Sequence, residues 1–331
     1  MNKVILLNKR PNGKPTLNDF KTITEEIPSA KDGEILLKTI YVSVDPYLRG
    51  RMNDSKSYVP SFELNKPIQS GIIAEVDVSK HPEFNTGDFI TANLDWKEYQ
   101  ISSGKGLHKV DENEAKLSAY LGVLGMTGLT AYLGLTEIGL PKQNETIVVS
   151  GAAGAVGTIV GQIGKLLGCK VIGITGSDEK VALLTSKFKF DDAINYKTTP
   201  NLKEAIKNAC PNGVDIYFDN VGGDISDAVL ANINNHARLP VCGAISLYND
   251  TKVSLGPRLQ PIILTKSATM RGFIVGDFFE KFPAATKQLA AWLKENNISF
   301  SETIVEGFDT IPQAFIDLFE GKNEGKMIVK I

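Results

Sequence analysis

The stretch from Thr146 to Lys180 constrains the fold of this chain more than any other part of the sequence. It opens with an apolar, β-branched run at Thr146–Val149 and continues through a glycine-rich turn into apolar residues at helical spacing over Val156–Leu167. A second β-branched run follows at Lys170–Thr175. Strand, turn, helix and strand together have the length of one βαβ unit, about 30 residues. The stretch therefore predicts two parallel strands joined by a helix.

Three glycines stand at the turn of this unit, at positions 151, 154 and 157. Glycine there allows a tight bend, lets the backbone approach a pyrophosphate and lets the helix start close to the strand. The amides and the positive dipole end of the helix then face the phosphates. Because the spacing is G-x-x-G-x-x-G and not the usual G-x-G-x-x-G, a tight turn without a ligand is the alternative; we favour a nucleotide-binding turn.

The segment 146–164 carries no charge, and its Gly157 and Gly161 match the spacing of a membrane-helix dimer. Five glycines and Gln162 argue against a membrane helix, because glycine is unfavourable in the middle of a helix. We therefore expect no membrane partner.

The length of 331 residues suggests two domains, at a prior of ~150 residues each. The net charge of −2 predicts no strong attraction to nucleic acid or to an anionic membrane. The N-terminal apolar run Val4–Leu7 is shorter than the ~7–15 residues of a signal-peptide core. The three cysteines are widely spaced, which argues against a disulfide framework. We expect a cytoplasmic protein with reduced thiols.

The three cysteines and three histidines never fall in a C-x-x-C or H-x-x-x-H arrangement. A structural zinc site needs four closely organised nitrogen or sulfur ligands, and a catalytic site about three. We therefore predict no metal site, and expect the electrons of any redox reaction to come from an organic cofactor.

The chain up to residue 124 is β-rich with frequent turns, with a strand predicted at Glu34–Val44, and the chain beyond it alternates strands with helices. Among the later elements we predict a helix at Asp224–Asn235, a strand at Ala237–Ile245 and a long helix at Asp277–Asn296. Repeated βα units imply a doubly wound parallel sheet. The last strand, Met327–Ile331, is expected to pair with the N-terminal β region.

In such a sheet, ligands lie outside the carboxyl ends of the strands. Four segments are predicted to share that rim: Gly151–Gly157, Asp219–Gly223, Cys242–Tyr248 and Phe273–Gly276.

The end of the second strand of the βαβ unit distinguishes NAD from NADP. An acidic residue there binds a ribose 2′-hydroxyl, and a basic residue nearby suits a 2′-phosphate. Gly176 stands where the acid is expected, and Lys180 follows one helical turn later. Asp178 and Glu179 complicate the interpretation, since the first turn of a helix attracts acids anyway. The residues favour NADP, with a solvated surface lysine as the alternative for Lys180.

Seven motifs along the chain now carry a family resemblance: SVDPYLR at 43–49, GMTGLTAY at 125–132, AAGAVG at 152–157, GSDEK at 176–180, NYK at 195–197, YFDNVGG at 217–223 and CGAIS at 242–246. The chain resembles the zinc-free medium-chain dehydrogenases/reductases nearly end to end. Within them it is most similar to the prostaglandin reductase (leukotriene dehydrogenase) branch, which includes plant double-bond reductases and bacterial curcumin-reductase-like enzymes.

The resemblance implies an α/β fold with a GroES-like β-rich catalytic domain, formed by 1–124 and 299–331, and a Rossmann NADP-binding domain at 125–298. It implies an NADP(H)-dependent, zinc-independent reductase of the C=C bond of α,β-unsaturated ketones and aldehydes, and a homodimer formed through Met270–Val275. The implied cofactor contacts are Thr130, Gly154, Ala155, Val156, Gly157, Lys180, Tyr196, Asn220, Cys242, Gly243, Ala244, Ile245, Ser246, Tyr248, Phe273, Ile274, Val275 and Asn323.

Two positions depart from the family pattern. Relatives commonly carry glycine where this chain has Lys189, and a positive φ there would suit lysine less well than glycine. The contact at Tyr196 depends on that turn. Leu247, before Tyr248, varies in the family and is expected to touch the substrate.

In the implied reaction, hydride passes from the nicotinamide to the substrate β-carbon, an enolate forms, and the α-carbon is protonated. A neutral donor near the carbonyl oxygen is then needed. Tyr248 is our first candidate, together with the cofactor ribose, because a phenol with a pKa of about 10 stays protonated at neutral pH; a tyrosine that only packs beside the ribose is the alternative. Tyr47 is the second candidate, and a structural turn aromatic is its alternative.

Other interpretations are open at this point. Arg49 and Arg51 are expected either to bind an acidic substrate tail or to form salt bridges at the domain interface. The same fold and cofactor suit a quinone reductase, and a non-catalytic NADPH-binding protein belongs to another functional class. A zinc alcohol dehydrogenase is the weakest alternative.

Overall fold

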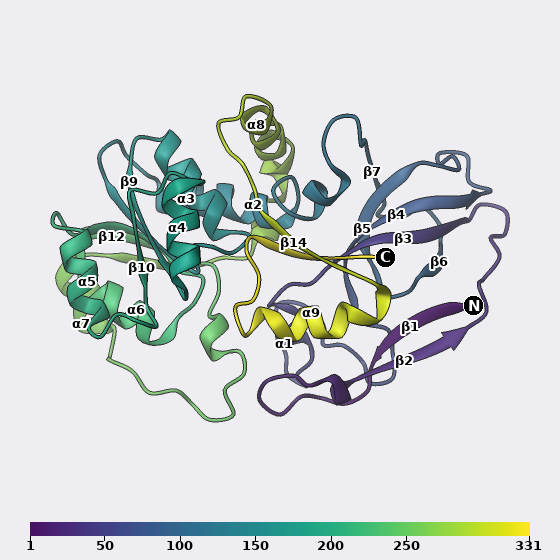
Figure 1. Ribbon diagram of the computed structural model, residues 1–331, viewed down its shortest axis with the longest axis horizontal. Helices are drawn as coiled ribbons and strands as arrows, with labels where there is room; N and C mark the ends of the chain where they lie inside the picture. Colours follow the sequence, from purple (N-terminus) through teal and green to yellow (C-terminus); the bar gives the residue numbers. More distant parts are fainter. The chain divides into compact units, whose positions relative to one another are not determined.

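The computed structural model describes residues 1–331, and the chain divides into two compact units (Figure 1). Unit 1 comprises Met1–Gly122, Glu302–Asn323 and Met327–Ile331. Unit 2 comprises Val123–Ser301 and Glu324–Lys326. Each unit has its own β-structure and its own apolar core.

Unit 1 is built mainly from β-strands that pack around a large apolar cluster. Strands β1 (Asn2–Leu7) and β2 (Phe20–Glu25) form an antiparallel pair. The larger sheet has the order β14-β15-β3-β4-β5-β7, with β6 paired to β3. Its strands are β3 (Ile35–Ser43), β4 (Gln69–Ser79), β5 (Phe89–Asp95), β6 (Tyr99–Ser102), β7 (His108–Val110), β14 (Glu302–Glu306) and β15 (Lys326–Lys330). Two helices, α1 (Leu48–Arg51) and α9 (Ile311–Leu318), belong to this unit.

The last strand completes the sheet of the N-terminal region. In β15, Ile328 lies opposite Ser43 and Val329 lies opposite Val42 of β3, in antiparallel register. Val42 and Val329 are fully buried in the core of the unit. The predicted pairing of the last strand is thus confirmed, and burial of its apolar residues explains it.

Unit 2 contains a six-stranded parallel sheet in the order β10-β9-β8-β11-β12-β13. Its strands are β8 (Thr146–Ser150), β9 (Lys170–Thr175), β10 (Asp192–Asn195), β11 (Val214–Phe218), β12 (Ile233–Val241) and β13 (Thr269–Gly272). Numbered along the chain, the strand order is 3-2-1-4-5-6, which is the doubly wound arrangement of dinucleotide-binding sheets. The order reverses between β8 and β11. The predicted fold class is confirmed.

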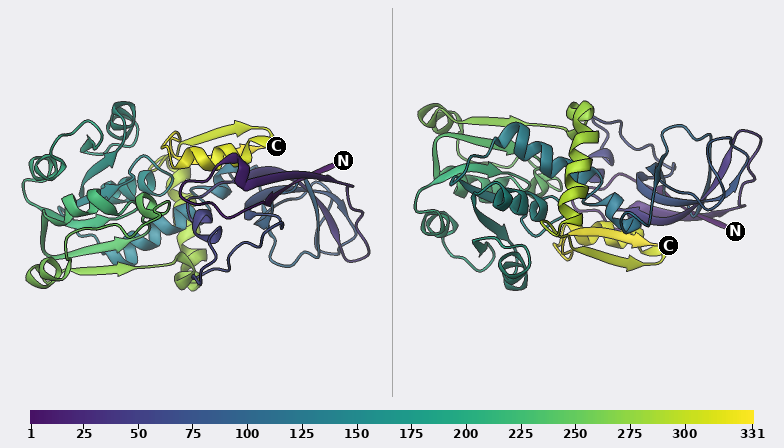
Figure 2. Two further views of the ribbon diagram at one scale, coloured as in Figure 1. Left: turned by 90° about the horizontal axis from the view of Figure 1, so that it is seen from below. Right: turned by 90° about the horizontal axis from the view of Figure 1, so that it is seen from above.

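Helices cover both faces of this sheet (Figure 2). The helices of unit 2 are α2 (Met126–Leu133), α3 (Gly157–Leu166), α4 (Asp178–Ser186), α5 (Leu202–Ala209), α6 (Gly223–Leu230), α7 (Gln260–Lys266) and α8 (Phe282–Lys294). Helices α5, α6 and α7 share one apolar cluster with the strands. Helix α3 packs so closely on the other elements that a Cβ at Gly164 would lie 2.8 Å from Ile147 Cδ1 of β8. The glycines of α3 therefore serve helix–strand packing, not a membrane interface.

Two predicted boundaries are wrong. The helix predicted at Asp224–Asn235 ends at Leu230, and the strand predicted at Ala237–Ile245 spans Ile233–Val241. The strand begins earlier because Ile233 is buried and pairs with Val214, and a register shift follows. After the helix ends, the Asn232 side-chain amide donates to the Ala228 carbonyl at 3.0 Å and so satisfies an acceptor of its last turn.

The long helix predicted at Asp277–Asn296 is also wrong at its start. Residues Val275–Lys281 form a 3₁₀ turn in which Phe278 has non-helical angles, and α8 runs from Phe282 to Lys294. Pro283 lies in the first turn of α8, where its missing N–H removes no helical hydrogen bond. A proline at that position marks the beginning of a helix.

Candidate functional site

The carboxyl ends of the six parallel strands of unit 2 meet at one edge of the sheet. The segments after β8, β11, β12 and β13 are Gly151–Gly157, Asp219–Gly223, Cys242–Tyr248 and Phe273–Gly276. They all begin at this edge, and two of them flank the point where the strand order reverses. That crevice is where doubly wound sheets bind dinucleotides.

The glycine turn after β8 tolerates no side chain at its last position. Gly151 has φ 58°, in the left-handed region. A Cβ at Gly157, the first residue of α3, would lie 2.5 Å from the Gly151 carbonyl oxygen and 2.7 Å from Ala152 Cα. At Gly154 only the Gly151 carbonyl oxygen, at 3.2 Å, comes near the Cβ position. The turn is thus crowded at Gly157 and open at Gly154, which fits close approach of a pyrophosphate to the backbone.

A buried carboxylate joins the ends of the central strands. Asp219, just after β11, is 2% exposed. Its Oδ1 accepts hydrogen bonds from Ser150 Oγ (3.1 Å) and Tyr217 Oη (2.9 Å). The same atom accepts the Val221 and Gly222 amides at 3.0 and 2.9 Å, and Oδ2 accepts Ser226 Oγ at 2.6 Å. Burial raises the pKa of Tyr217 well above its ordinary value, so that this phenol remains a donor. This network shapes the turn that leads into α6.

The segments after β11 and β12 run side by side. The Asp219 carbonyl accepts the amides of Cys242 (2.8 Å) and Gly243 (3.1 Å). The Asn220 side chain donates to the Ser150 carbonyl at 2.8 Å, which ties β11 to the end of β8. The family resemblance implied Asn220 as a cofactor contact, and Asp219 was predicted only as the first residue of a rim segment. Its hydrogen-bond network was not predictable, because a buried network has no local signature.

Tyr248 folds back over the start of its own segment. Its Oη accepts the Ala244 amide at 3.2 Å, and a Cβ at Gly243 would lie 3.1 Å from the same oxygen. Burial raises its pKa, and the Ala244 hydrogen bond opposes that shift. The phenol is therefore protonated at neutral pH. Because Oη is the acceptor in this hydrogen bond, the bond does not use the hydroxyl hydrogen of Tyr248.

The end of β9 presents a basic surface. A Cβ at Gly176 would lie 3.2 Å from both Tyr196 Cε1 and Lys197 Cε, so that a larger residue would press on these two side chains. Burial lowers the pKa of Lys180; Glu324 opposes this shift, and Lys197 adds to it. The two lysines and the Tyr196 hydroxyl suit a phosphate group on the ribose. Lys197 was quoted from the sequence only as part of the NYK motif and was not predicted as a phosphate contact, although it directly follows Tyr196.

The neighbouring acids do not compete for this surface. Asp178 accepts the Asn195 amide at 2.7 Å, and Glu179 is exposed and hydrogen-bonded to Ser177. They belong to the first turn of α4, where acids stabilise the helix.

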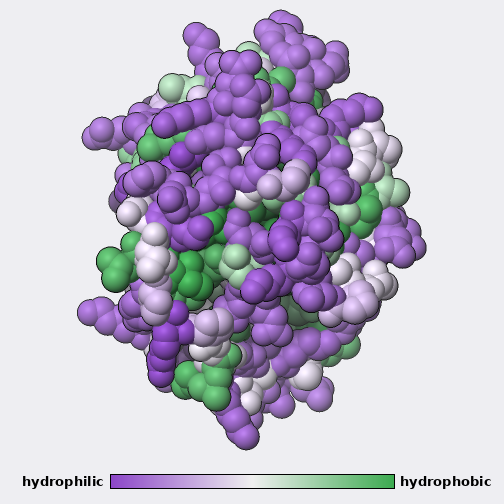
Figure 3. Space-filling model, turned by 90° about the vertical axis from the view of Figure 1, so that its left-hand side faces the viewer, coloured by the Kyte–Doolittle hydropathy of each residue, from purple (hydrophilic) through white to green (hydrophobic).

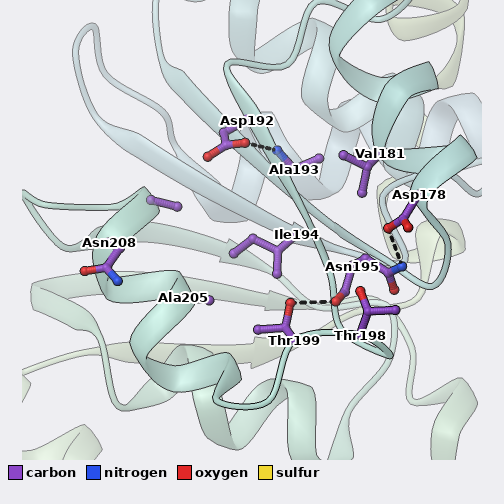
Figure 4. A pocket seen from close by; sticks show the side chains of 11 residues that line it. Asp178, Val181, Asp192, Ala193, Ile194, Asn195, Thr198, Thr199, Ala205 and Asn208 are labelled. Carbon is purple, nitrogen blue, oxygen red and sulfur yellow. Dashed lines mark hydrogen bonds between the residues drawn. The ribbon is translucent and has the colours of Figure 1, made fainter.

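Figure 4 shows a pocket along the edge strand β10, between α4 and α5. Asp178 and Asp192 are among its lining residues, and no lysine or arginine is. A phosphate would meet carboxylates here without a cation, so this pocket does not fit the phosphates of a dinucleotide.

The remaining predicted contacts of unit 2 have distinct surroundings. Thr130, on α2, directs its hydroxyl to the Met126 carbonyl at 2.7 Å. The Phe273 ring is buried edge-on against Phe218, with centroids 6.3 Å apart, whereas Ile274 is 39% exposed. Phe273 therefore has only its backbone to offer a ligand. Asn323 ends a segment of unit 1 and directly precedes Glu324.

The turn before β10 departs from ideal backbone geometry. Lys189 has φ 61°, the left-handed conformation that glycine adopts without strain. Its Nζ donates to the Ser186 carbonyl at 2.7 Å.

In unit 1, Tyr47 stands immediately before α1 and packs partly buried against the core. Burial raises its pKa, with a further contribution from Asp45. The phenol therefore stays protonated.

Arg49 and Arg51 both donate hydrogen bonds within unit 1. Arg49 is 4% exposed and donates to the carbonyls of Pro11 and Gly13 and to Asn53 Oδ1. Arg51 donates to the Pro60 carbonyl at 3.0 Å and stacks 4.0 Å over Phe62. Both hold loops of their own unit.

No group of three or more His, Cys, Asp or Glu side chains is placed to hold a metal ion. None of the helices has the length and apolar character needed to cross a membrane. On the face drawn in Figure 3, hydrophilic residues predominate and hydrophobic residues form small groups.

Comparisons with known proteins agree with this arrangement. Residues 3–110 match the family model "N-terminal domain of oxidoreductase", and residues 155–292 match "Zinc-binding dehydrogenase". YfmJ of Bacillus subtilis (strain 168), named as an NADP-dependent oxidoreductase, is 53% identical over 329 residues, which cover 99% of this chain and 97% of YfmJ. Prostaglandin reductase 1 of Bos taurus is 45% identical over 332 residues, covering 98% of this chain and 97% of the relative. A crystal structure of CurA from Vibrio vulnificus in complex with NADPH superposes with a TM-score of 0.95 at 41% identity, covering 99% of this chain and 98% of CurA.

Proposed function

The chain belongs to the medium-chain dehydrogenases/reductases, in the branch that includes prostaglandin reductase 1, and we propose that it reduces the C=C double bond of α,β-unsaturated ketones and aldehydes with NADPH. The observation that carries this proposal is the rim of unit 2, where a glycine turn, a basic surface and a protonated phenol follow neighbouring strands of one sheet. The NADPH complex of the 41% identical CurA supports the choice of cofactor.

The residues at the rim fit a bound NADP(H). The backbone of Gly154–Gly157 would receive the pyrophosphate, and Lys180 with Tyr196 would receive the 2′-phosphate. The segments Cys242–Ser246 and Phe273–Val275 and residues Thr130, Asn220 and Asn323 complete the proposed contacts. The bound cofactor supplies a hydride equivalent, and the chain's own groups hold the cofactor and stabilise the charge that develops on the substrate.

Tyr248 is proposed to donate a hydrogen bond to the carbonyl oxygen of the substrate. Negative charge develops on that oxygen as the β-carbon accepts hydride, and a neutral donor stabilises it. The raised pKa of the phenol keeps its proton in place, and its Oη is oriented by the Ala244 amide. The α-carbon then takes a proton from solvent. Tyr47, also protonated, is the second proposed donor.

Replacing Tyr248 with phenylalanine tests this role. We expect kcat for an enone at saturating NADPH to fall about 100- to 1000-fold, as for loss of one donor at a developing oxyanion. Tyr47→Phe is the matched comparison. An unchanged kcat in Tyr248→Phe would remove this residue from the mechanism.

The substrate class needs a separate measurement. NADPH oxidation is followed with an enone, an enal and a quinone of similar size. The proposal requires higher kcat/KM for the enone and enal. Faster turnover of the quinone would make the chain a quinone reductase, and tight NADPH binding without oxidation would make it a binding protein. Metal analysis of the active protein tests zinc independence, since stoichiometric zinc would refute it.

We also propose a cytoplasmic homodimer. Strand β13 is the terminal strand of its sheet, and all four of its residues are exposed. An unpaired strand edge is suited to pair with a second copy. Light scattering at micromolar concentration should give twice the mass of the 35.9 kDa chain; a monomer mass would refute the dimer.

A further inference from the structure

A short segment of the C-terminal region is attached to the cofactor rim. Glu324–Lys326 belongs to unit 2, although the residues on either side of it belong to unit 1. The Gly325 amide donates to the Ala153 carbonyl at 2.8 Å, and Gly325 forms a parallel bridge with Gly154. Glu324 is thereby held next to the glycine turn that we assign to the pyrophosphate.

Close packing and backbone hydrogen bonds hold this segment in place. Gly325 has φ 62°, and a Cβ there would lie 1.9 Å from the Ser301 carbonyl oxygen. The Lys326 amide donates to the same carbonyl at 2.9 Å. Glu324 is exposed, so that its carboxylate is carried on a fixed backbone at the surface of the rim.

Helix α4 presents its lysines toward this segment. Lys180 lies in the first turns of α4 and Lys187 at its end, seven residues apart, which is nearly two turns and hence the same face. Lys187 Nζ donates to Ser301 Oγ at 2.6 Å, so that this face runs along the backbone of Ser301 and its partners Gly325 and Lys326. Lys180 occupies the end of that face nearest the carboxyl ends of the strands.

Two neighbouring charges of opposite sign, those of Glu324 and Lys197, act on Lys180. Burial lowers the pKa of Lys180, and the attraction of Glu324 raises it against the repulsion of Lys197. Glu324 therefore interacts with the lysine that we assign to the 2′-phosphate. A phosphate monoester carries about −1.5 to −2 charges at neutral pH. A 2′-phosphate bound at Lys180 would replace the attraction between Lys180 and Glu324 with its own attraction to Lys180. It would also be repelled by the Glu324 carboxylate.

We propose that Glu324 is a specificity-determining residue that serves as an internal counter-ion of Lys180, competes with the 2′-phosphate of NADPH, and so lowers the preference of the enzyme for NADPH over NADH. This inference rests on the proposed use of NADPH. NADH lacks the 2′-phosphate and is not subject to this competition. The carboxylate discriminates by repulsion, as a specificity device against one of two related ligands.

The test uses the full-length enzyme and two probes, adenosine 2′,5′-bisphosphate and AMP, which differ only in the 2′-phosphate. Isothermal titration gives their dissociation constants for the parent enzyme and for Glu324→Gln. We expect the bisphosphate to bind about 3- to 10-fold more tightly to Glu324→Gln, the range for a partly exposed charge pair. The gain should shrink at 0.5 M salt, because exposed charges are screened. AMP should bind equally to both proteins.

Two further variants separate this effect from a general change of charge. Glu179→Gln removes the same charge from the residue next to Lys180, but its carboxylate is bonded to Ser177; it should change bisphosphate binding less than twofold. In a Lys180→Gln background, Glu324→Gln should have no effect. The ratio of NADPH to NADH dissociation constants should move in parallel with the probes.

The outcomes are distinct. No tightening in Glu324→Gln, equal tightening in Glu179→Gln, or a full effect without Lys180 would each overturn the inference while leaving NADPH use intact. Equal binding of the two probes by the parent enzyme would refute the NADPH assignment itself, and the inference with it. Thermal unfolding of the variants, expected to match the parent because Glu324 is exposed, verifies that each is folded.

Discussion

The Asp219 carboxylate accepts five hydrogen bonds in a nearly dry environment, and Asp219→Asn tests what that network does. The substitution keeps the shape of the side chain but removes its charge. Hydrogen bonds to a charged acceptor contribute about 1.5–3 kcal/mol each and neutral ones about 0.5–1.5. Five bonds weakened by about 1 kcal/mol each would sum to about 5 kcal/mol. Since Ser226 can reverse its hydroxyl toward Tyr217, part of this is recovered. We expect a loss of about 2–4 kcal/mol in the free energy of unfolding.

Asp215→Asn is the matched control, because Asp215 lies in the same strand, β11, toward its opposite end. Its carboxylate accepts the Thr146 amide and the Asn234 side-chain amide, each at 2.8 Å. With two such bonds and more solvent, we expect a loss of about 1 kcal/mol. This residue is far along the strand from the rim, so that its substitution should leave NADPH binding unchanged.

Urea unfolding followed by tryptophan fluorescence measures stability, and titration of NADPH fluorescence measures its dissociation constant. For Asp219→Asn we expect NADPH to bind at least about tenfold more weakly, because the backbone after β11 loses its fixed shape. Equal stability losses in the two variants, or parent-like NADPH binding in Asp219→Asn, would show that the network does not organise the rim.

Three further predictions concern the backbone and the thiols. Gly157→Ala should cost at least about 2 kcal/mol of stability and abolish tight NADPH binding, because its Cβ would lie 2.5 Å from the Gly151 carbonyl oxygen. The control Gly272→Ala, whose Cβ would have nothing within 4 Å, should not alter NADPH titrations. Lys189→Gly should raise the free energy of unfolding by about 0.5–1 kcal/mol, since relief of a left-handed lysine, about 1–2 kcal/mol, exceeds the entropic cost of glycine; a lower melting temperature would contradict this. Burial raises the pKa of Cys210 to about 11 and of Cys242 to about 12, from 9.0. The unfolded chain therefore releases these protons first, and the free energy of unfolding should fall as pH rises above 9, by up to about 1.4 kcal/mol per pH unit and thiol. Urea unfolding between pH 8 and 10.5 measures this slope, and a flat profile would be contrary evidence.

The doubly wound sheet was predictable because its signals are local. Buried parallel strands are continuous apolar runs such as Thr146–Val149, and the turn to α3 requires glycine at Gly157 for steric reasons alone. Right-handed crossovers between consecutive βα units then place helices on both faces of the sheet. Element boundaries were harder to predict. The strand β12 begins at Ile233 because that residue is buried against β11, a tertiary contact that outweighs the helical pattern before it.

The partners of charged side chains were not predictable in the same way. Arg49 is a cation in a polar turn, as a residue that binds an acidic substrate would be. It is nevertheless buried and donates to carbonyls 36 and 38 residues earlier in the chain. Asp219 is recognisable only once Ser150, 69 residues away, is brought beside it by the pairing of β8 with β11. Charge alone does not say which partner a side chain finds, because that depends on the fold.

The same limit applies to the rule that relates the end of the second strand to cofactor choice. That rule examines Gly176 and Lys180 and predicts NADP from the missing acid. In the structure a second cation, Lys197, lies beside Gly176, and an acid from the C-terminal region, Glu324, attracts Lys180. Two cations and one carboxylate leave the same net positive charge as Lys180 alone, which still favours a 2′-phosphate, while Glu324 offsets the contribution of Lys197. Preference for NADPH is then a matter of degree, set by the sum of these charges. We accordingly expect measurable NADH-dependent reduction by the parent enzyme, and a larger NADPH preference in Glu324→Gln than in the parent.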